Sequence, residues 1–181
     1  PVQSDGIYKK DQIYTVRIRT VNVQLAQYFS EKLVNHFNQQ IKGLTLEMRV
    51  IPKKFLSQLY TITPAVIKYC GSTADGESGG YWKTRISFEQ YEERLKVNLI
   101  KKYNVAMNTS IDEDFDLYQQ IELTNRKPIA IPYKGIRLLG DKLKIQVADN
   151  AMAQELAYFA IGVGLCELNA RGLGFVNYRY L

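Results

Sequence analysis

Four glycines near the carboxyl end form the segment of the sequence best suited to contact a phosphate. They occur within thirteen residues as two G-x-G pairs, at Gly162, Gly164, Gly172 and Gly174. Asn169 and Arg171 lie between the pairs, and an aromatic strand pattern begins at Phe175. Glycines adopt positive φ and allow close backbone approach, so backbone N–H groups of such a loop can face a phosphate. A helix C-cap and a tight turn would explain one or two of these glycines, but not both pairs.

Basic side chains beside aromatic or strand-end positions supply further candidates for phosphate contacts. They are Lys53, Lys54, Lys83 and Arg85. In a nucleic-acid complex, such cations hold backbone phosphates while a neighbouring ring, here Tyr81 or Trp82, stacks on an unpaired base. The alternative is that they are solvated surface cations. Arg171 is the first candidate for an RNA contact, followed by Lys53 and Lys54.

The sequence contains one histidine, His36, which is the candidate for proton transfer. The apolar spacing predicts a helix over residues 23–38, capped by Asn22. On that helix His36 would lie about 20° from Phe29, within the apolar stripe. A lone histidine there is either a catalytic acid or base, or a side chain packed or hydrogen-bonded at an interface. Both interpretations stay open.

The elements that position these residues form two units. Residues 13–19 and 44–51 have strand alternation on either side of the predicted helix, which gives a strand–helix–strand unit. Strands follow at 59–67, 116–125, 133–139, 142–147 and 175–180, with helices from a capping box at Ser87 and Gln90 and over 151–161. This second order is that of a ferredoxin-like fold. The predicted class is α+β, with tandem ferredoxin-like (RRM-like) folds over 1–58 and 59–181, the first incomplete.

The glycine segment resembles that of the CRISPR repeat-RNA-processing endoribonucleases, the sixth numbered Cas family, within the RAMP superfamily. The resemblance rests on the G-x-G…G-x-G-F arrangement between a helix and the last strand. A dinucleotide fingerprint is excluded, because its glycines lie between a strand and the start of a helix. The Thr63-Pro64 segment and the region 129–147, with Gly135 and Gly140, are also similar to the family pattern.

The resemblance implies binding of CRISPR repeat RNA and metal-independent cleavage. The 2′-hydroxyl attacks the adjacent phosphate and leaves a 2′,3′-cyclic phosphate and a 5′-hydroxyl, which needs a base, an acid and a cation. Two registers are open for the catalytic histidine. In one, residues 23–38 are the first helix and His36 is catalytic. In the favoured one, 1–58 is the second half of the first fold and the usual histidine precedes Pro1.

Two other functions remain alternatives. One is an inactive homologue that holds guide RNA as a scaffold or as a subunit of an effector complex with other Cas proteins. The other is a ferredoxin-like protein without a nucleic-acid role. An incomplete first fold leaves a sheet edge exposed, so a homodimer is also expected.

The composition and charge of the chain further limit the kind of protein it can be. The 181 residues carry a net charge of +6, and both ends of the chain are basic around an acidic middle, which favours a polyanion partner. No apolar run approaches the ~18 residues of a membrane span. Cys70 and Cys166 do not form a disulfide framework, and the consecutive acidic residues at 112–116 lack the spacing of a calcium loop. We therefore expect a cytoplasmic protein without metal or cofactor.

Overall fold

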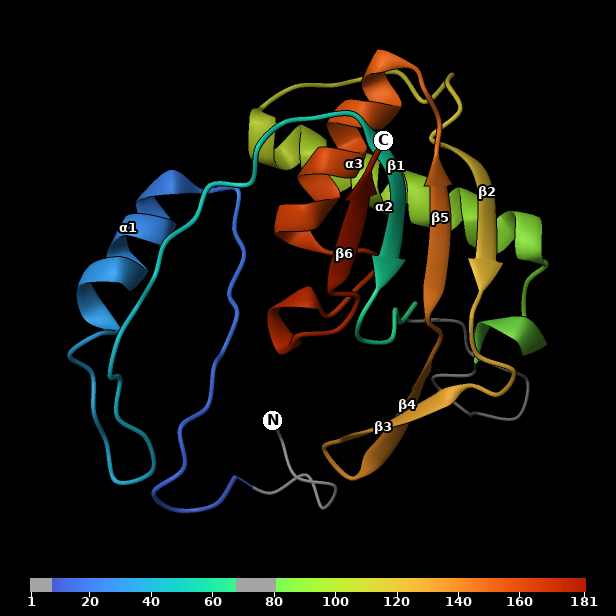
Figure 1. Cartoon of the computed structure of the whole chain (residues 1–181). Helices are drawn as coiled ribbons and strands as arrows, with labels where there is room; N and C mark the ends of the chain where they lie inside the picture. Colours follow the sequence, from blue (N-terminus) through green and yellow to red (C-terminus); the bar gives the residue numbers. More distant parts are fainter. Residues whose placement is uncertain (1–7, 68–80) are drawn as a thin grey trace.

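The structure is a computed structural model that describes residues 8–67 and 81–181. Its main unit has the order β1 (Leu56–Thr61), α2 (Phe88–Met107), β2 (Tyr118–Leu123), β5 (Leu143–Val147), α3 (Ala151–Val163) and β6 (Val176–Tyr180). The four strands form one antiparallel sheet in the order β2-β5-β1-β6 (Figure 1). This strand–helix–strand, strand–helix–strand arrangement confirms the predicted ferredoxin-like fold.

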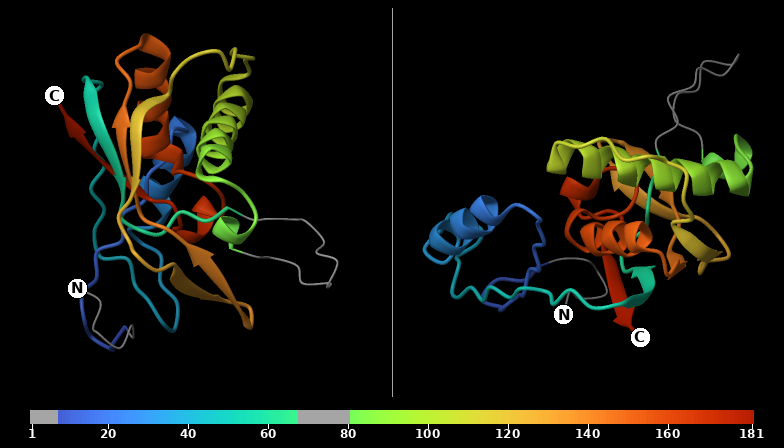
Figure 2. Two further views of the ribbon diagram at one scale, coloured as in Figure 1. Left: turned by 90° about the vertical axis from the view of Figure 1, so that its right-hand side faces the viewer. Right: turned by 90° about the horizontal axis from the view of Figure 1, so that it is seen from above.

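Both long helices cover one face of this sheet and leave the other open (Figures 1 and 2). The covered face carries alternating apolar residues such as Leu56, Leu59 and Ile145, all at most 5% exposed. From α2, Tyr91, Leu95 and Leu99 pack into the same core, as their spacing predicted. Burying each such side chain contributes about 1.5–3 kcal/mol, so this interface is the main source of stability.

Local signals in the sequence set the starts of the helices. The hydroxyl of Ser87 accepts the backbone N–H of Gln90, and the Gln90 side chain accepts the N–H of Ser87, which confirms the capping box. Asn150 caps α3 by accepting the N–H of Ala153 at 2.9 Å. Among the described helices, none combines the length and apolar character needed to cross a bilayer.

A separate hairpin, β3 (Ile129–Tyr133) with β4 (Ile136–Gly140), is inserted between β2 and β5. The predicted strand over 133–139, joined to 142–147 by a turn at Gly140 and Asp141, was wrong in its pairing. Lys134 and Gly135 both have positive φ, which is the geometry of a type I′ hairpin turn, so β4 folds back on β3.

The helix predicted over 23–38 is shorter in the structure: α1 covers Val23–Lys32. Its cap is as predicted, because Asn22 Oδ1 accepts the N–H of Leu25 at 2.9 Å. The helix ends at its C-cap, Leu33, and in the turn that follows Asn38 Oδ1 accepts two backbone N–H groups, from Gln40 and Ile41. These local bonds compete with helix continuation.

The strands expected over 13–19 and 44–51 are not formed as hydrogen-bonded strands in the described chain. Their apolar residues are exposed, for example Val16 at 77% and Val50 at 87%. An extended segment becomes a strand only when a neighbour pairs with it, and no such neighbour is present among the described residues. The completeness of this first unit stays a prediction.

Candidate nucleic-acid interface

The glycine loop, residues 164–175, connects α3 to β6 and contains a short 3₁₀ helix, η2 (Asn169–Arg171). Gly164 and Gly174 both have positive φ and are buried where the two ends of the loop meet. The N–H of Leu165 donates to the Gly174 carbonyl at 2.9 Å. A Cβ on Gly174 would lie only 2.0 Å from the Leu165 carbonyl oxygen. These glycines therefore serve contacts of the loop with itself.

Gly172 differs from these two because it faces open space. Its φ is +81°, it is exposed, and a Cβ added there would meet no atom within 4 Å. Gly162 lies in the last turn of α3, where a Cβ would come within 2.5 Å of Val21 Cγ1. Of the four glycines picked out in the sequence, Gly172 alone leaves its surroundings free for a ligand.

The side chain of Asn169 is used inside the loop. Its amide donates to the carbonyls of Leu165 at 2.8 Å and Leu173 at 2.9 Å. Its Oδ1 accepts from Lys102 Nζ at 2.6 Å. Asn169, expected from the sequence to contact RNA, thus has both ends of its amide engaged within the protein.

Lys102 projects from α2 into the glycine loop and was missed by sequence reasoning. Besides Asn169, its Nζ donates to the carbonyl oxygens of Gly164, at 3.2 Å, and Cys166. Burial lowers the pKa of Lys102 to about 8. A sequence signal exists: Lys102 follows Leu99 by three residues and so continues the buried face of α2.

The Thr63-Pro64 segment holds the other side of the loop. Thr63 Oγ1 donates to the Gly172 carbonyl at 2.6 Å and accepts the N–H of Phe175 at 2.8 Å. The N–H of Gly174 donates to the Pro64 carbonyl at 2.8 Å. The two motifs singled out in the sequence, whose bonded residues are 109 to 112 positions apart, therefore form one structural unit. The loop conformation is fixed from both sides.

The exposed part of the loop meets the turn of the β3–β4 hairpin. The Arg171 guanidinium carbon lies 4.4 Å from the centroid of the Tyr133 ring. Lys134 Nζ lies 5.8 Å from the same ring. We call Tyr133, Lys134, Arg171 and Gly172 the loop surface. It combines two cations and an aromatic ring, the groups that bind phosphates and stack on unpaired bases. They lie beside the exposed Gly172, whose own N–H and carbonyl are bonded to Asn169 and Thr63.

The other predicted cations fall at two ends of the sheet. Lys53 and Lys54 precede β1 at the end opposite the glycine loop, since Leu56 pairs with Tyr180 and Thr61 with Val176. A strand of this length separates them from the loop by roughly 17–20 Å. Lys53 is also ion-paired with Glu155. The structure does not bring these two lysines to the loop surface.

Lys83 and Arg85 lie in and just after η1 (Trp82–Thr84), on the loop's end of the sheet. Trp82 Nε1 donates to the buried carboxylate of Asp141 at 2.7 Å, and the backbone of Asp141 bridges to Ala65, next to Pro64. Lys83 Nζ lies 5.5 Å from the Trp82 ring. The neighbouring segment, with Cys70 and the Gly/Ser/Asp-rich stretch, is outside the described residues.

His36 lies in the exposed turn after α1, not on a helix face, which corrects its predicted placement in an apolar stripe. The backbone N–H of His36 donates to the Leu33 carbonyl at 3.3 Å, and the backbone carbonyl of His36 accepts the N–H of Gly43 at 2.8 Å. Figures 1 and 2 place α1 beyond β6, to one side of the sheet. The structure does not bring His36 to the loop surface.

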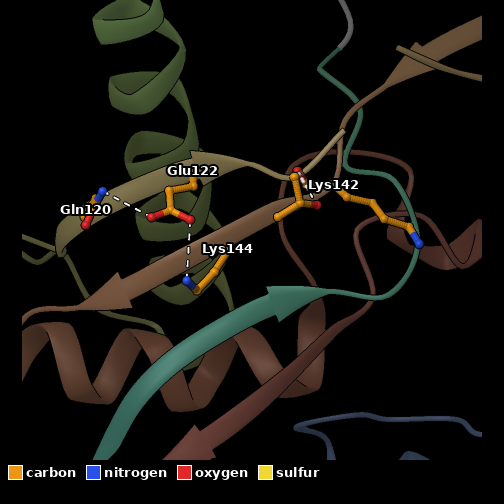
Figure 3. Close-up of polar contacts among 5 residues, drawn as sticks. Gln120, Glu122, Lys142 and Lys144 are labelled. Carbon is orange, nitrogen blue, oxygen red and sulfur yellow. Dashed lines mark hydrogen bonds and ion pairs between the residues drawn. The ribbon is translucent and has the colours of Figure 1, made fainter. Parts of the chain in front are cut away.

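The open face of the sheet is a second polar surface, with a shallow hollow lined by Gln58, Gln120, Glu122, Lys144 and Gln146. Glu122 and Lys144 point toward each other from β2 and β5, whereas Lys142 points away (Figure 3). Their charged atoms are 3.4 Å apart, and Gln120 also donates to Glu122. This pairing neutralises the Lys144 charge, which makes the face less suited to phosphate than the loop surface. No group of three or more His, Cys, Asp or Glu in the described residues is arranged to hold a metal ion.

Three solved structures share the fold of this chain. A structure described as "CRISPR associated protein Cas6" is 27% identical with a TM-score of 0.52, and the match covers 74% of this chain and 52% of that one. A "Cas6-related gene from Pyrococcus furiosus" is 21% identical with a TM-score of 0.52 over 73% and 51% of the two chains. "An RAMP protein binding different RNA substrates" is 18% identical with a TM-score of 0.63 over 89% and 66%.

The chain thus spans about half the length of the first two of these structures. A comparison with curated proteins found no match. Residues 51–178 match the family described as "CRISPR associated protein Cas6, C-terminal". This range includes β1, β2, β5, both long helices, the glycine loop and the first part of β6. On this match and on the tandem glycine pairs at its end, the chain belongs to the Cas6 family.

Proposed function

We propose that this chain binds CRISPR repeat RNA through the loop surface. The observation that carries the proposal is the contact of Arg171 with Tyr133 beside the exposed Gly172. An arginine stacked on a ring keeps its N–H donors available for a phosphate, and the ring edge or a flanking base can extend the stack. The family membership supports repeat RNA as the nucleic acid, and the basic net charge of the chain supports a polyanion.

We further propose that the repeat RNA is cut without a metal ion. The 2′-hydroxyl attacks the adjacent phosphate, its proton passes to a base, and an acid protonates the departing 5′-oxygen. The products are a 2′,3′-cyclic phosphate and a 5′-hydroxyl. Arg171 is the residue placed to offset charge on the phosphorane. Lys83 and Arg85, on the same end of the sheet, remain proposed phosphate contacts, whereas Lys53 and Lys54 would contact a different part of the RNA.

A scaffold function without cleavage is the second candidate, and the position of His36 favours it. The sequence has this one histidine. It lies in the exposed segment after α1, and α1 lies to one side of the sheet (Figure 1). A chain that binds repeat RNA but lacks a proton-transfer group at the loop would hold guide RNA within a larger assembly of Cas proteins. Binding and cleavage must therefore be measured separately.

One experiment separates the candidates. The whole chain is incubated in EDTA with an end-labelled repeat RNA from a CRISPR array of the same genome. We expect binding that weakens as salt rises, because bound cations release counterions from the RNA. Cleavage with cyclic-phosphate ends supports the nuclease, and binding alone supports the scaffold. No salt-dependent binding would contradict both.

Two substitutions locate the binding surface. R171A removes the cation of the loop surface, and we expect about a tenfold loss of affinity and a smaller salt slope. K101A is the control, because Lys101 is an exposed cation on α2 that is not part of the loop surface. Equal effects of the two variants would contradict the assignment of the surface. H36A with unchanged cleavage would eliminate His36 as the catalytic residue.

A further inference from the structure

The ammonium group of Lys102 has a match of donors and acceptors that a surface lysine does not have. It carries three N–H donors, and it faces three oxygen acceptors: the carbonyls of Gly164 and Cys166 and Oδ1 of Asn169. All three belong to the segment around the glycine loop, whereas Lys102 belongs to α2. One side chain therefore joins the helix to three points of the loop.

The three acceptors lie at the positions that decide the shape of the loop. Gly164 ends α3 with φ of +78°, and Cys166 also has a positive φ, of 57°. Asn169 begins η2 and holds the carbonyls of Leu165 and Leu173 through its amide. Without the Lys102 donor, these oxygens would lose a hydrogen-bond partner in a part-buried place, which disfavours this loop conformation.

We propose that Lys102 is the positioning residue of the RNA-binding loop: it fixes the backbone that presents Arg171 and Gly172, without itself touching RNA. This inference rests on the proposed binding of repeat RNA by the loop surface. The Nζ of Lys102 points into the loop, and its three N–H groups donate to oxygens of the loop. Arg171 is two residues after Asn169 on the same 3₁₀ turn, so a shift of Asn169 moves Arg171.

The surroundings of Lys102 give the proposal a signature in pH. Burial lowers the pKa of Lys102 to about 8, opposed by the nearby Cys166 thiol and Glu167 carboxylate. Burial also raises the pKa of Cys166 to about 12, so the thiol does not titrate between pH 7 and 9. A neutral amine keeps two N–H donors, one fewer than the acceptors it faces. Lys102 therefore makes all three hydrogen bonds below pH 8, and one of them is lost as pH rises through 8.

The test compares K102M with K101M in RNA binding. Lys101 is the exposed neighbour on α2 and loses the same charge. Dissociation constants are measured with labelled repeat RNA over a salt series, with thermal unfolding as the folding control. We expect K102M to bind at least tenfold more weakly with an unchanged salt slope, and K101M to change affinity less than twofold. R171A, in contrast, lowers the salt slope, because its cation neutralises a phosphate.

Each outcome decides the proposal. Wild-type affinity in K102M would overturn it, and so would a smaller salt slope in K102M, because Lys102 would then be a phosphate contact. If K102M does not fold, the wild-type pH profile decides: affinity falling with a midpoint near pH 8 supports the proposal, and a flat profile from 7 to 9 overturns it. If the wild-type chain itself binds no repeat RNA, the proposed function fails. If the wild-type chain binds and K102M binds equally well, the proposed function stands and the role of Lys102 alone fails.

Discussion

At the scale of single residues, the buried carboxylate of Asp141 is the most connected polar group of the loop end. It is 0% exposed and accepts from the Tyr81 hydroxyl, Trp82 Nε1 and Asn125 Nδ2, at 2.7–2.9 Å. D141N would place an amide N–H₂ against these donors. We expect a loss of about 2–4 kcal/mol in the free energy of unfolding.

Denaturant unfolding of D141N measures this loss, with D149N as the control because Asp149 is exposed. A D141N midpoint equal to that of D149N would show that the three donors find other partners. The carboxylate would then not hold η1 against β5.

The two glycines of the second G-x-G pair make a further contrast between residues. Both have positive φ, so alanine strains the backbone by about 1–2 kcal/mol at either site. At Gly174 the new Cβ would also lie 2.0 Å from the Leu165 carbonyl oxygen, whereas at Gly172 it meets nothing. We expect G174A to destabilise the protein by at least about 3 kcal/mol and G172A by about 1–2 kcal/mol. Equal unfolding midpoints for G172A and G174A would contradict the contact.

At the scale of elements, the extended segment before α1 is tied to β6 by Arg19. Its guanidinium donates to the Val176 carbonyl and to Asn177 Oδ1, and it lies 4.6 Å from the Phe175 ring. We expect R19A to release residues 8–22, with faster amide exchange there and a melting temperature lowered by no more than a few degrees. R17A is the control, because Arg17 is exposed. Equal exchange in R19A and R17A would show that the segment is held by other contacts.

Elements with their own local signals could be predicted from the sequence, and those set by pairing could not. The capping box at Ser87 and the apolar stripe of α2 depend on residues three or four apart, so periodicity located them. The β3–β4 hairpin depends on positive φ at Lys134, a non-glycine residue, and was mispaired. The strands expected over 13–19 and 44–51 need partners that the described chain does not supply.

The candidate site was predicted in the same uneven way. The glycine pairs and Arg171 were visible as a motif, and Thr63 by its similarity to a family pattern. Lys102 was not, because a lysine on a helix is usually solvated and its partners are 62 to 67 residues away. The internal use of Asn169 also depends on tertiary contacts that spacing does not encode.

At the scale of the whole molecule, stability is concentrated in the part of the chain from Ile51 onward. The core and the residues packed against it all lie there, while α1 has no buried residue. We expect a chain of residues 51–181 to unfold cooperatively, with a melting temperature within about 5 °C of the full chain. Thermal unfolding of the two chains checks this. A shortened chain that does not fold would show that residues 8–50 are needed for the sheet.

The apolar residues of 8–50 predict a second property of the whole molecule. Exposed apolar side chains such as Ile13, Phe37 and Val50 are concentrated in this region. Contiguous exposed apolar surface commonly marks an interaction site. We expect the full chain to self-associate as its concentration rises, and residues 51–181 to stay monomeric, by sedimentation or light scattering. Monomers at all concentrations would contradict the expected homodimer.

The position of the β3–β4 hairpin between β2 and β5 separates the packing of the sheet from the residues of the loop surface. Within the described part of the chain, β3 and β4 pair with each other and leave the order β2-β5-β1-β6 intact. Tyr133, at the end of β3 beside the turn, carries the ring that Arg171 contacts. A relative with a longer, shorter or differently charged β3–β4 hairpin would therefore keep the same packing of the four-stranded sheet and its helices. Under the proposed binding of repeat RNA, the choice of repeat can diversify there while the scaffold remains constant.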